Sequence, residues 1–186
     1  MSLYAQFDPT VPSPSPVITW YDTDFANYPN LPPESNLLEV SAVQWTAHLA
    51  NPGGWAVSNG ELVPYTVPLT AAQVAQTAYS VAVAVGVAIV STGTPSLNGA
   101  YALDQASLGR IAAEQTYIAT TGKFTNGQTT RAWPDLSGAP HVFPSTAEFV
   151  AFAEAVAQYD DALLTALAAG NAGGAWVAPA LPGPIP

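Results

Sequence analysis

The residues best suited to chemistry lie in one short stretch, "TTRAWPDLSGAPHVF", at positions 129–143. This stretch brings together Arg131, Trp133, Asp135 and His141, which supply a cation, an indole ring, a carboxylate and an imidazole. Alternate side chains of a strand point to the same face, so Arg131, Trp133 and Asp135 share one face of the first strand. His141 has the same parity and would lie on that face of the return strand. A cluster capable of acid–base chemistry is therefore geometrically possible.

Catalysis by this cluster would need a nucleophile, a base and an orienting group within hydrogen-bonding reach. No nearby serine stands in an activating setting. The alternative is a structural hairpin that turns at 136–138, in which Arg131 pairs with an acid, Trp133 lies across a helix and His141 is a cross-strand neighbour. We favour the structural hairpin, and a ligand site remains the alternative.

Other motifs predict no catalytic, metal or cofactor site. His48 and His141 lie on separate elements without an adjacent carboxylate pattern, which disfavours a metal centre. The acids of "YDTD" at 21–24 lack the glycine and closing glutamate of a calcium loop, and the glycine pairs at 53–54 and 173–174 match no phosphate-binding pattern. We predict no cofactor, and we interpret Asp160 and Asp161 as a solvated helix face.

The composition of the chain limits the classes of partner that it can bind. The 186 residues carry a formal charge of −10, because three basic residues oppose thirteen acids. Such a chain offers no basic face to nucleic acid or to an anionic membrane surface, and without cysteine it has no disulfides or thiolate chemistry. No signal peptide is visible. The most apolar run, at 78–90, is shorter than the roughly twenty residues that span a bilayer, so we predict a buried helix that passes into a strand.

Capping and turn signals predict an α+β fold of successive β-hairpin-plus-helix units. Asn59-Gly60 marks a tight hairpin turn, and Ser41, Thr70, Asp104 and Ser145 are candidate N-caps. The predicted helices cover 42–50, 71–85, 105–122 and a longest one after 145, whose apolar face comprises Phe149, Phe152, Val156, Tyr159 and Leu163. The predicted organisation is a β-rich module with one short helix at 1–67, a hairpin–helix domain at 68–170 and an extended arm at 171–186.

Aromatic residues crowd the first 65 positions in greater number than a module of that size can bury. Leftover aromatic surface suits an assembly interface or a glycan-stacking platform. The predicted interaction residues are Trp20, Tyr21, Tyr28, Trp55 and, in the proline-rich arm, Trp176. The arm has little else to bury except Val177, so we expect it to be flexible or extended and, where ordered, to lie against another chain or along its own body.

Two runs resemble phage proteins. The first, "YDTD…YPNLPP…LLEVSAVQW…PGGWAVSNGELVPYT", resembles the start of small bacteriophage tail proteins, including tail-fibre assembly proteins. The second, "STGTPSLNGAYALD…RIAAEQTYIATTGKFTNGQTTRAWPDLSGAPHVFPSTAEFVAFAEAVAQY", is similar to the phage and prophage module DUF4376, in which a tryptophan–aspartate hairpin with a histidine after the turn precedes a long helix. Together they cover about 20–165.

The resemblance implies a non-enzymatic tail protein, either a tail-fibre-associated structural component or a tail-fibre assembly chaperone. Its partners would be other tail or tail-fibre proteins or further copies of itself, in the virion tail or in the host cytoplasm during assembly. The alternative is a carbohydrate-binding receptor module that presents its N-terminal aromatics to a host glycan. A glycan-cleaving enzyme is disfavoured, because it would need paired carboxylates about 5 to 10 Å apart and the acids here are scattered.

Overall fold

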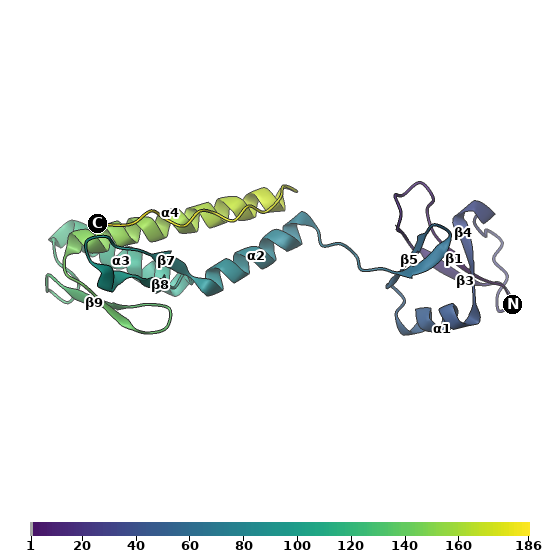
Figure 1. Cartoon of the computed structure of the whole chain (residues 1–186), viewed down its shortest axis with the longest axis horizontal. Helices are drawn as coiled ribbons and strands as arrows, with labels where there is room; N and C mark the ends of the chain where they lie inside the picture. Colours follow the sequence, from purple (N-terminus) through teal and green to yellow (C-terminus); the bar gives the residue numbers. More distant parts are fainter. Residues whose placement is uncertain (1) are drawn as a thin grey trace. The chain divides into compact units, whose positions relative to one another are not determined.

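The computed structural model describes residues 2–186. They form two compact units, the first ending at Pro68 and the second covering Leu69–Pro186. Four α-helices and several small antiparallel sheets make up the described chain, so the fold is α+β as predicted (Figure 1). Each unit has a hydrophobic core of its own.

Two three-stranded antiparallel sheets build the first unit, one in the order β3-β1-β4 and the other in the order β2-β5-β6. Their strands are β1 (Leu3–Gln6), β2 (Ser15–Pro16), β3 (Thr19–Asp22), β4 (Leu37–Val40), β5 (Trp55–Ser58) and β6 (Glu61–Pro64). The segment 13–24 is divided between the two sheets, because β2 joins β5, whereas β3 forms an edge beside β1. A single helical turn, η1 (Glu34–Asn36), precedes β4.

The helix cap and the hairpin turn that the sequence predicts in the first unit are both present. Helix α1 (Ala42–Ala50) begins at a capping box, in which the Ser41 side chain accepts the Gln44 N–H and the Gln44 side chain accepts the Ser41 N–H. Asn59 and Gly60 have φ angles of 53° and 78°, which the tight turn between β5 and β6 requires.

The second unit contains the remaining helices and two hairpins. Its elements are α2 (Ala71–Val85), β7 (Val87–Ile89), η2 (Pro95–Leu97), β8 (Gly99–Tyr101), α3 (Gln105–Thr121), β9 (Arg131–Pro134), β10 (Pro140–Phe143) and α4 (Thr146–Asn171). The predicted N-caps Thr70, Asp104 and Ser145 each accept a backbone N–H from the third residue beyond them. The predicted order of a hairpin followed by a helix is confirmed three times, for β5-β6 before α2, β7-β8 before α3 and β9-β10 before α4.

Glycine is required where α2 turns into β7. Gly86 has a φ of 76°, and a Cβ added there would lie 2.4 Å from the carbonyl oxygen of Tyr101. Only glycine combines this conformation with so close an approach to the neighbouring strand.

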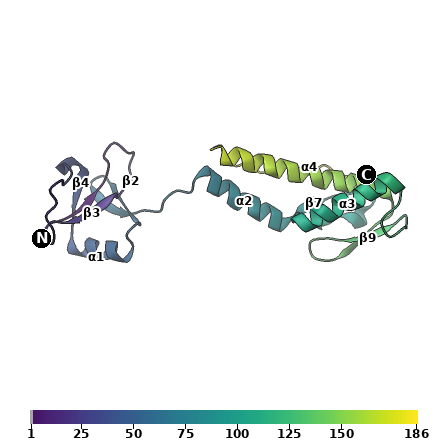
Figure 2. The same ribbon diagram turned by 180° about the vertical axis from the view of Figure 1, so that it is seen from behind.

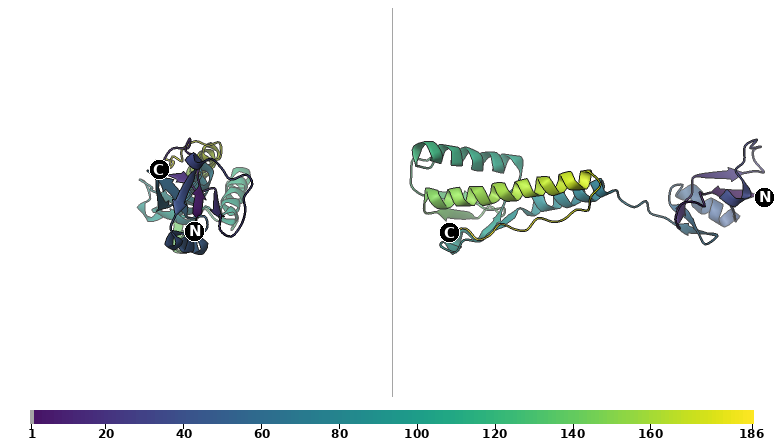
Figure 3. Two further views of the ribbon diagram at one scale, coloured as in Figure 1. Left: turned by 90° about the vertical axis from the view of Figure 1, so that its right-hand side faces the viewer. Right: turned by 90° about the horizontal axis from the view of Figure 1, so that it is seen from above.

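Helix α4 is the centre of the second unit, and both α2 and α3 pack against it (Figures 2 and 3). All five residues of its predicted apolar face are buried, together with aliphatic and aromatic residues of both hairpins. Near the end of α4, a Cβ at Gly170 would lie 2.2 Å from the Cβ of Ala75, so small residues set the approach of α2 to α4.

Helix α2 is less buried than the sequence predicts. Ala75 is its one fully buried residue, and Val81 and Val85 are 57% and 62% exposed. The turn of the chain into β7 follows the prediction, but one side of the helix faces solvent. Within residues 2–186 no helix is both long and apolar enough to cross a membrane.

The arm at 171–186 is ordered along its own unit (Figures 1 and 3). Ile185 forms an isolated parallel bridge with Ser91 and is only 5% exposed, whereas Val177 is 72% exposed. The arm thus follows the body of its own chain, one of the two predicted outcomes. The arm contacts the core through Ile185 and the half-buried Trp176, whereas Val177, which the sequence offered with Trp176 as one of its few residues to bury, remains exposed.

Candidate functional site

The stretch 129–143 forms the predicted hairpin, with His141 opposite Trp133 and Phe143 opposite Arg131. Trp133 is 7% exposed and packs edge-on against Phe149 of α4, with 5.1 Å between ring centres. The face that these residues share is thus turned toward the core, while Val142 on the other face is 53% exposed. The hairpin positions its polar residues at the margins of the core.

On one side of the hairpin, Arg131 pairs with Glu114 of α3. The Arg131 Nη1 lies 2.9 Å from Glu114 Oε2, and the Glu114 side chain is 3% exposed. The two carboxylate oxygens of Glu114 also accept the backbone N–H and the hydroxyl of Thr125, at 2.7 and 2.8 Å, and Arg131 donates to that hydroxyl as well. The sequence predicted that Arg131 would pair with an acid but did not identify which one. The structure identifies it as Glu114.

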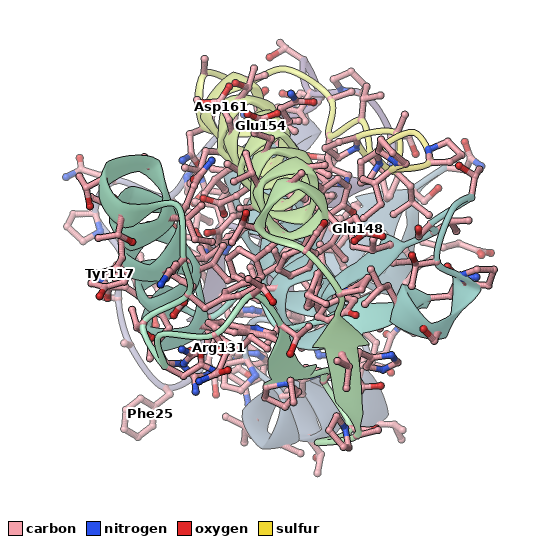
Figure 4. The ribbon with its side chains drawn as sticks, turned by 90° about the vertical axis from the view of Figure 1, so that its left-hand side faces the viewer. Phe25, Tyr117, Arg131, Glu148, Glu154 and Asp161 are labelled. Carbon is pink, nitrogen blue, oxygen red and sulfur yellow. The ribbon has the colours of Figure 1, made fainter. Side chains whose placement is uncertain are left out.

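A pocket of about 270 Å³ lies between α3 and β9, and both arginines of the sequence line it together with Trp133. The guanidinium carbons of Arg110 and Arg131 lie 6.0 and 5.6 Å from the centre of the Trp133 ring. Figure 4 labels Arg131 in the region between α3 and the hairpin. Cations held over an indole face are stabilised by its quadrupole, so the pocket is a cationic site with an aromatic wall.

On the other side of the hairpin, Asp135 and His141 form the acid–imidazole pair that the parity of the two strands made possible. The His141 Nε2 lies 3.2 Å from Asp135 Oδ2, and its Nδ1 lies 2.5 Å from the carbonyl oxygen of Ser96. The carbonyl can only accept, so Nδ1 carries a proton. Asp135 Oδ1 accepts the N–H and hydroxyl of Ser137 and the N–H of Ala139, which closes the turn.

These contacts shift the pKa values of both Asp135 and His141. The hydroxyl of Ser137 and then His141 lower the pKa of Asp135 to about 2. The Ser96 carbonyl and then Asp135 raise the pKa of His141 against the opposing effect of burial. The imidazole therefore bridges the turn and the Ser96 loop as a clamp, and both contacts favour its charged form.

The pair has the acid and base of a hydrolytic triad but not its nucleophile. Ser137 donates to Asp135 rather than to the imidazole, and neither ring nitrogen of His141 bonds to a hydroxyl in the described part of the chain. The geometry is that of a structural clamp. No group of three or more metal-ligating side chains that could hold an ion occurs among residues 2–186.

The two acids in the middle of α4 differ from each other. Asp160 is half-buried and Asp161 is exposed. Burial and then the neighbouring charge of Asp161 raise the pKa of Asp160. The prediction of a solvated face holds for the exposed Asp161 and is wrong for the half-buried Asp160, although both acids border a shallow hollow between α3 and α4.

Most of the predicted interaction aromatics are partly buried. Trp20 stacks on His48 at 3.8 Å and meets Trp45 edge-on at 6.0 Å, and Tyr21 meets Tyr28 edge-on at 5.0 Å. Trp20 and Trp45 enclose His48 beside the mainly aliphatic core of the first unit, and Tyr21 and Tyr28 form a separate pair, so these rings do not make a bare platform.

The remaining aromatics behave in different ways. Trp55 is half-buried, and its Nε1 is buried without a hydrogen-bond partner. Trp176 of the arm is half-buried against the core of the second unit. Phe25 lies open at 89% exposure, and the predicted interaction residues do not include it.

No known protein family, curated protein or solved structure matches the chain.

Proposed function

We propose that this protein is a non-enzymatic phage or prophage tail protein that works by binding other proteins. It acts as a tail-fibre-associated component or as a tail-fibre assembly chaperone, in the virion tail or in the host cytoplasm during assembly. The resemblance of its sequence to tail proteins supplies the context. The observation that carries a binding role is the apolar surface left bare on two helices.

The first bare surface is a stripe along α2. Val74, Val81 and Val85 are 43%, 57% and 62% exposed. Their spacing of seven and four residues places them on one face of the helix. The neighbouring face, with Ala75, packs against α4. An apolar stripe beside a covered one is the pattern of a helix that receives a second partner.

The second bare surface lies on α1 of the other unit. Val43 is 79% exposed, and with Ala42, Thr46, Ala47 and Ala50 it lines a shallow hollow. None of these side chains is charged, in a chain whose net charge is −10. A surface of this kind favours apolar protein contacts over solvation.

The test is capture of the tail-fibre protein encoded by the same phage or prophage. Val81→Glu places a charge in the α2 stripe and should abolish capture, since an unpaired charge in an apolar interface is strongly unfavourable. Val142→Glu, on the exposed face of β10, is the matched control and should bind as the unchanged chain does. Equal capture by both variants would refute a role for the stripe. Detection of the chain in purified particles separates a tail component from a chaperone.

The alternative, a glycan-binding module, has one supporting observation. Phe25 projects into solvent beside a hollow that Tyr28 and Asn27 also line, and an exposed ring is suited to stacking on a sugar. Binding on a glycan array that is lost in Phe25→Ala would favour this function over the first.

A further inference from the structure

The cations of this chain are gathered to an unusual degree. The sequence has only three lysines and arginines, and both arginines line the pocket between α3 and β9. The third cation, Lys123, is exposed and does not line it. In a chain of net charge −10, this pocket is the place where a negative group is not repelled by its immediate surroundings.

The two arginines are not equivalent. Arg131 is neutralised by the buried carboxylate of Glu114, whose oxygens are filled by Arg131 and Thr125. Arg110 is exposed, donates one side-chain hydrogen bond, to the Ser107 hydroxyl at 3.1 Å, and makes no ion pair within the described chain. A guanidinium has five donors, so Arg110 retains donors for a further partner.

We propose that this pocket binds one carboxylate group, from an aspartate or glutamate side chain of a partner protein, with Arg110 as its ion-pair partner. The proposal rests on the protein-binding function above. The Arg110 guanidinium lies over the Trp133 ring at the pocket, and this planar group matches the two oxygens of a carboxylate.

The pocket's charge and size both select this group. The lining residues, two arginines and Glu114, leave one net positive charge, which the nearby carboxylate of Asp104 partly offsets across the Ser107 hydroxyl. This balance suits a monoanion, and Glu114 repels the second charge of a phosphate. The volume of about 270 Å³ is at the small end for ligand pockets, which begin at roughly 300 Å³.

The walls favour a side chain over an acidic sugar. Ala113, Ala132 and Pro134 provide apolar contact, while Thr125 and Glu114 already bond to each other and to Arg131. Few polar groups therefore remain for the hydroxyls of a sugar. The methylene groups of an acidic side chain fit such a wall.

The probe is N-acetylglutamate N-methylamide, titrated into the full-length ¹⁵N-labelled chain at constant ionic strength. The Trp133 indole N–H signal, assigned with Trp133→Phe, should shift and saturate, and the neutral glutamine analogue should leave it unchanged. Arg110→Gln should weaken binding by roughly tenfold or more, since a charge-assisted hydrogen bond contributes about that much. Arg110→Lys should retain part of the affinity.

Lys123→Gln is the matched control, because it removes the same charge outside the pocket and should bind as the unchanged chain does. Equal weakening by Arg110→Gln and Lys123→Gln, or no saturable shift, would overturn the proposal. Tighter binding of glucuronate than of the glutamate derivative would overturn the side-chain assignment. If the chain captures the tail-fibre protein but does not bind the probe, only the carboxylate site is refuted. If the chain binds the probe but does not capture the tail-fibre protein, the result counts against the proposed function.

Discussion

Ile185 forms a parallel bridge with Ser91, at the strand edge that follows β7. Its N–H donates to the carbonyl of Val90, its carbonyl accepts the N–H of Thr92, and the Ser91 hydroxyl donates to the carbonyl of Pro186. The end of the arm is therefore part of the second unit's core and covers backbone groups that an open edge would expose.

Ile185→Ala should lower the free energy of unfolding of the second unit by about 2 to 5 kcal/mol, because a buried aliphatic side chain is lost. Leu181→Ala in the same arm should change it by less than about 0.5 kcal/mol, since Leu181 is 56% exposed. Urea unfolding followed by amide signals of the second unit measures both. Equal effects would show that the arm is not anchored at Ile185.

Trp133→Ala should destabilise the second unit by about 3 to 5 kcal/mol, through the cavity left against Phe149. Val142→Ala on the outer face of the same hairpin should cost about 0.5 kcal/mol or less. Chemical denaturation followed by near-ultraviolet circular dichroism tests the pair. Near-native stability of Trp133→Ala would contradict a structural hairpin.

Glu114→Gln should destabilise the second unit by roughly 1 to 3 kcal/mol, because it removes a charged acceptor and leaves Arg131 without its ion pair. Glu154→Gln on the exposed face of α4 removes the same charge and serves as control. Thermal unfolding should separate the two variants. The structural role of the ion pair fails if both melt alike.

The two histidines should give the two units opposite pH dependence around 6.5, the ordinary histidine pKa. Burial between Trp20 and Trp45 lowers the pKa of His48, so its contribution to stability is present above 6.5 and is lost as pH falls through the lowered value. The raised pKa of His141 works the other way: its contribution is full below 6.5 and is lost as pH rises through the raised value.

Amide hydrogen exchange, corrected for intrinsic rates, measures the stability of each unit across this range. His48→Gln should flatten the pH dependence of the first unit alone, and His141→Gln that of the second alone. The imidazole signals in NMR should titrate on opposite sides of 6.5. Parallel behaviour of the two units would contradict the assigned environments.

The helix and turn boundaries could be predicted from the sequence because they depend on contacts within four residues. Ser41, Thr70, Asp104 and Ser145 cap helices through the third residue beyond them, and the Asn59-Gly60 turn depends on its own backbone angles. The apolar face of α4 was likewise readable, since helical periodicity alone places its residues together.

Tertiary structure decided which of several apolar or polar groups would meet. Helix α2 is apolar on more than one face, so periodicity could not tell that Ala75 would face α4 and Val81 solvent. Sequence spacing could not bring His141 to the Ser96 carbonyl or Arg110 to Trp133, because those contacts join elements far apart in the chain. Ile185 was overlooked among prolines, since burial is a property of the surface that receives a side chain as much as of the side chain itself.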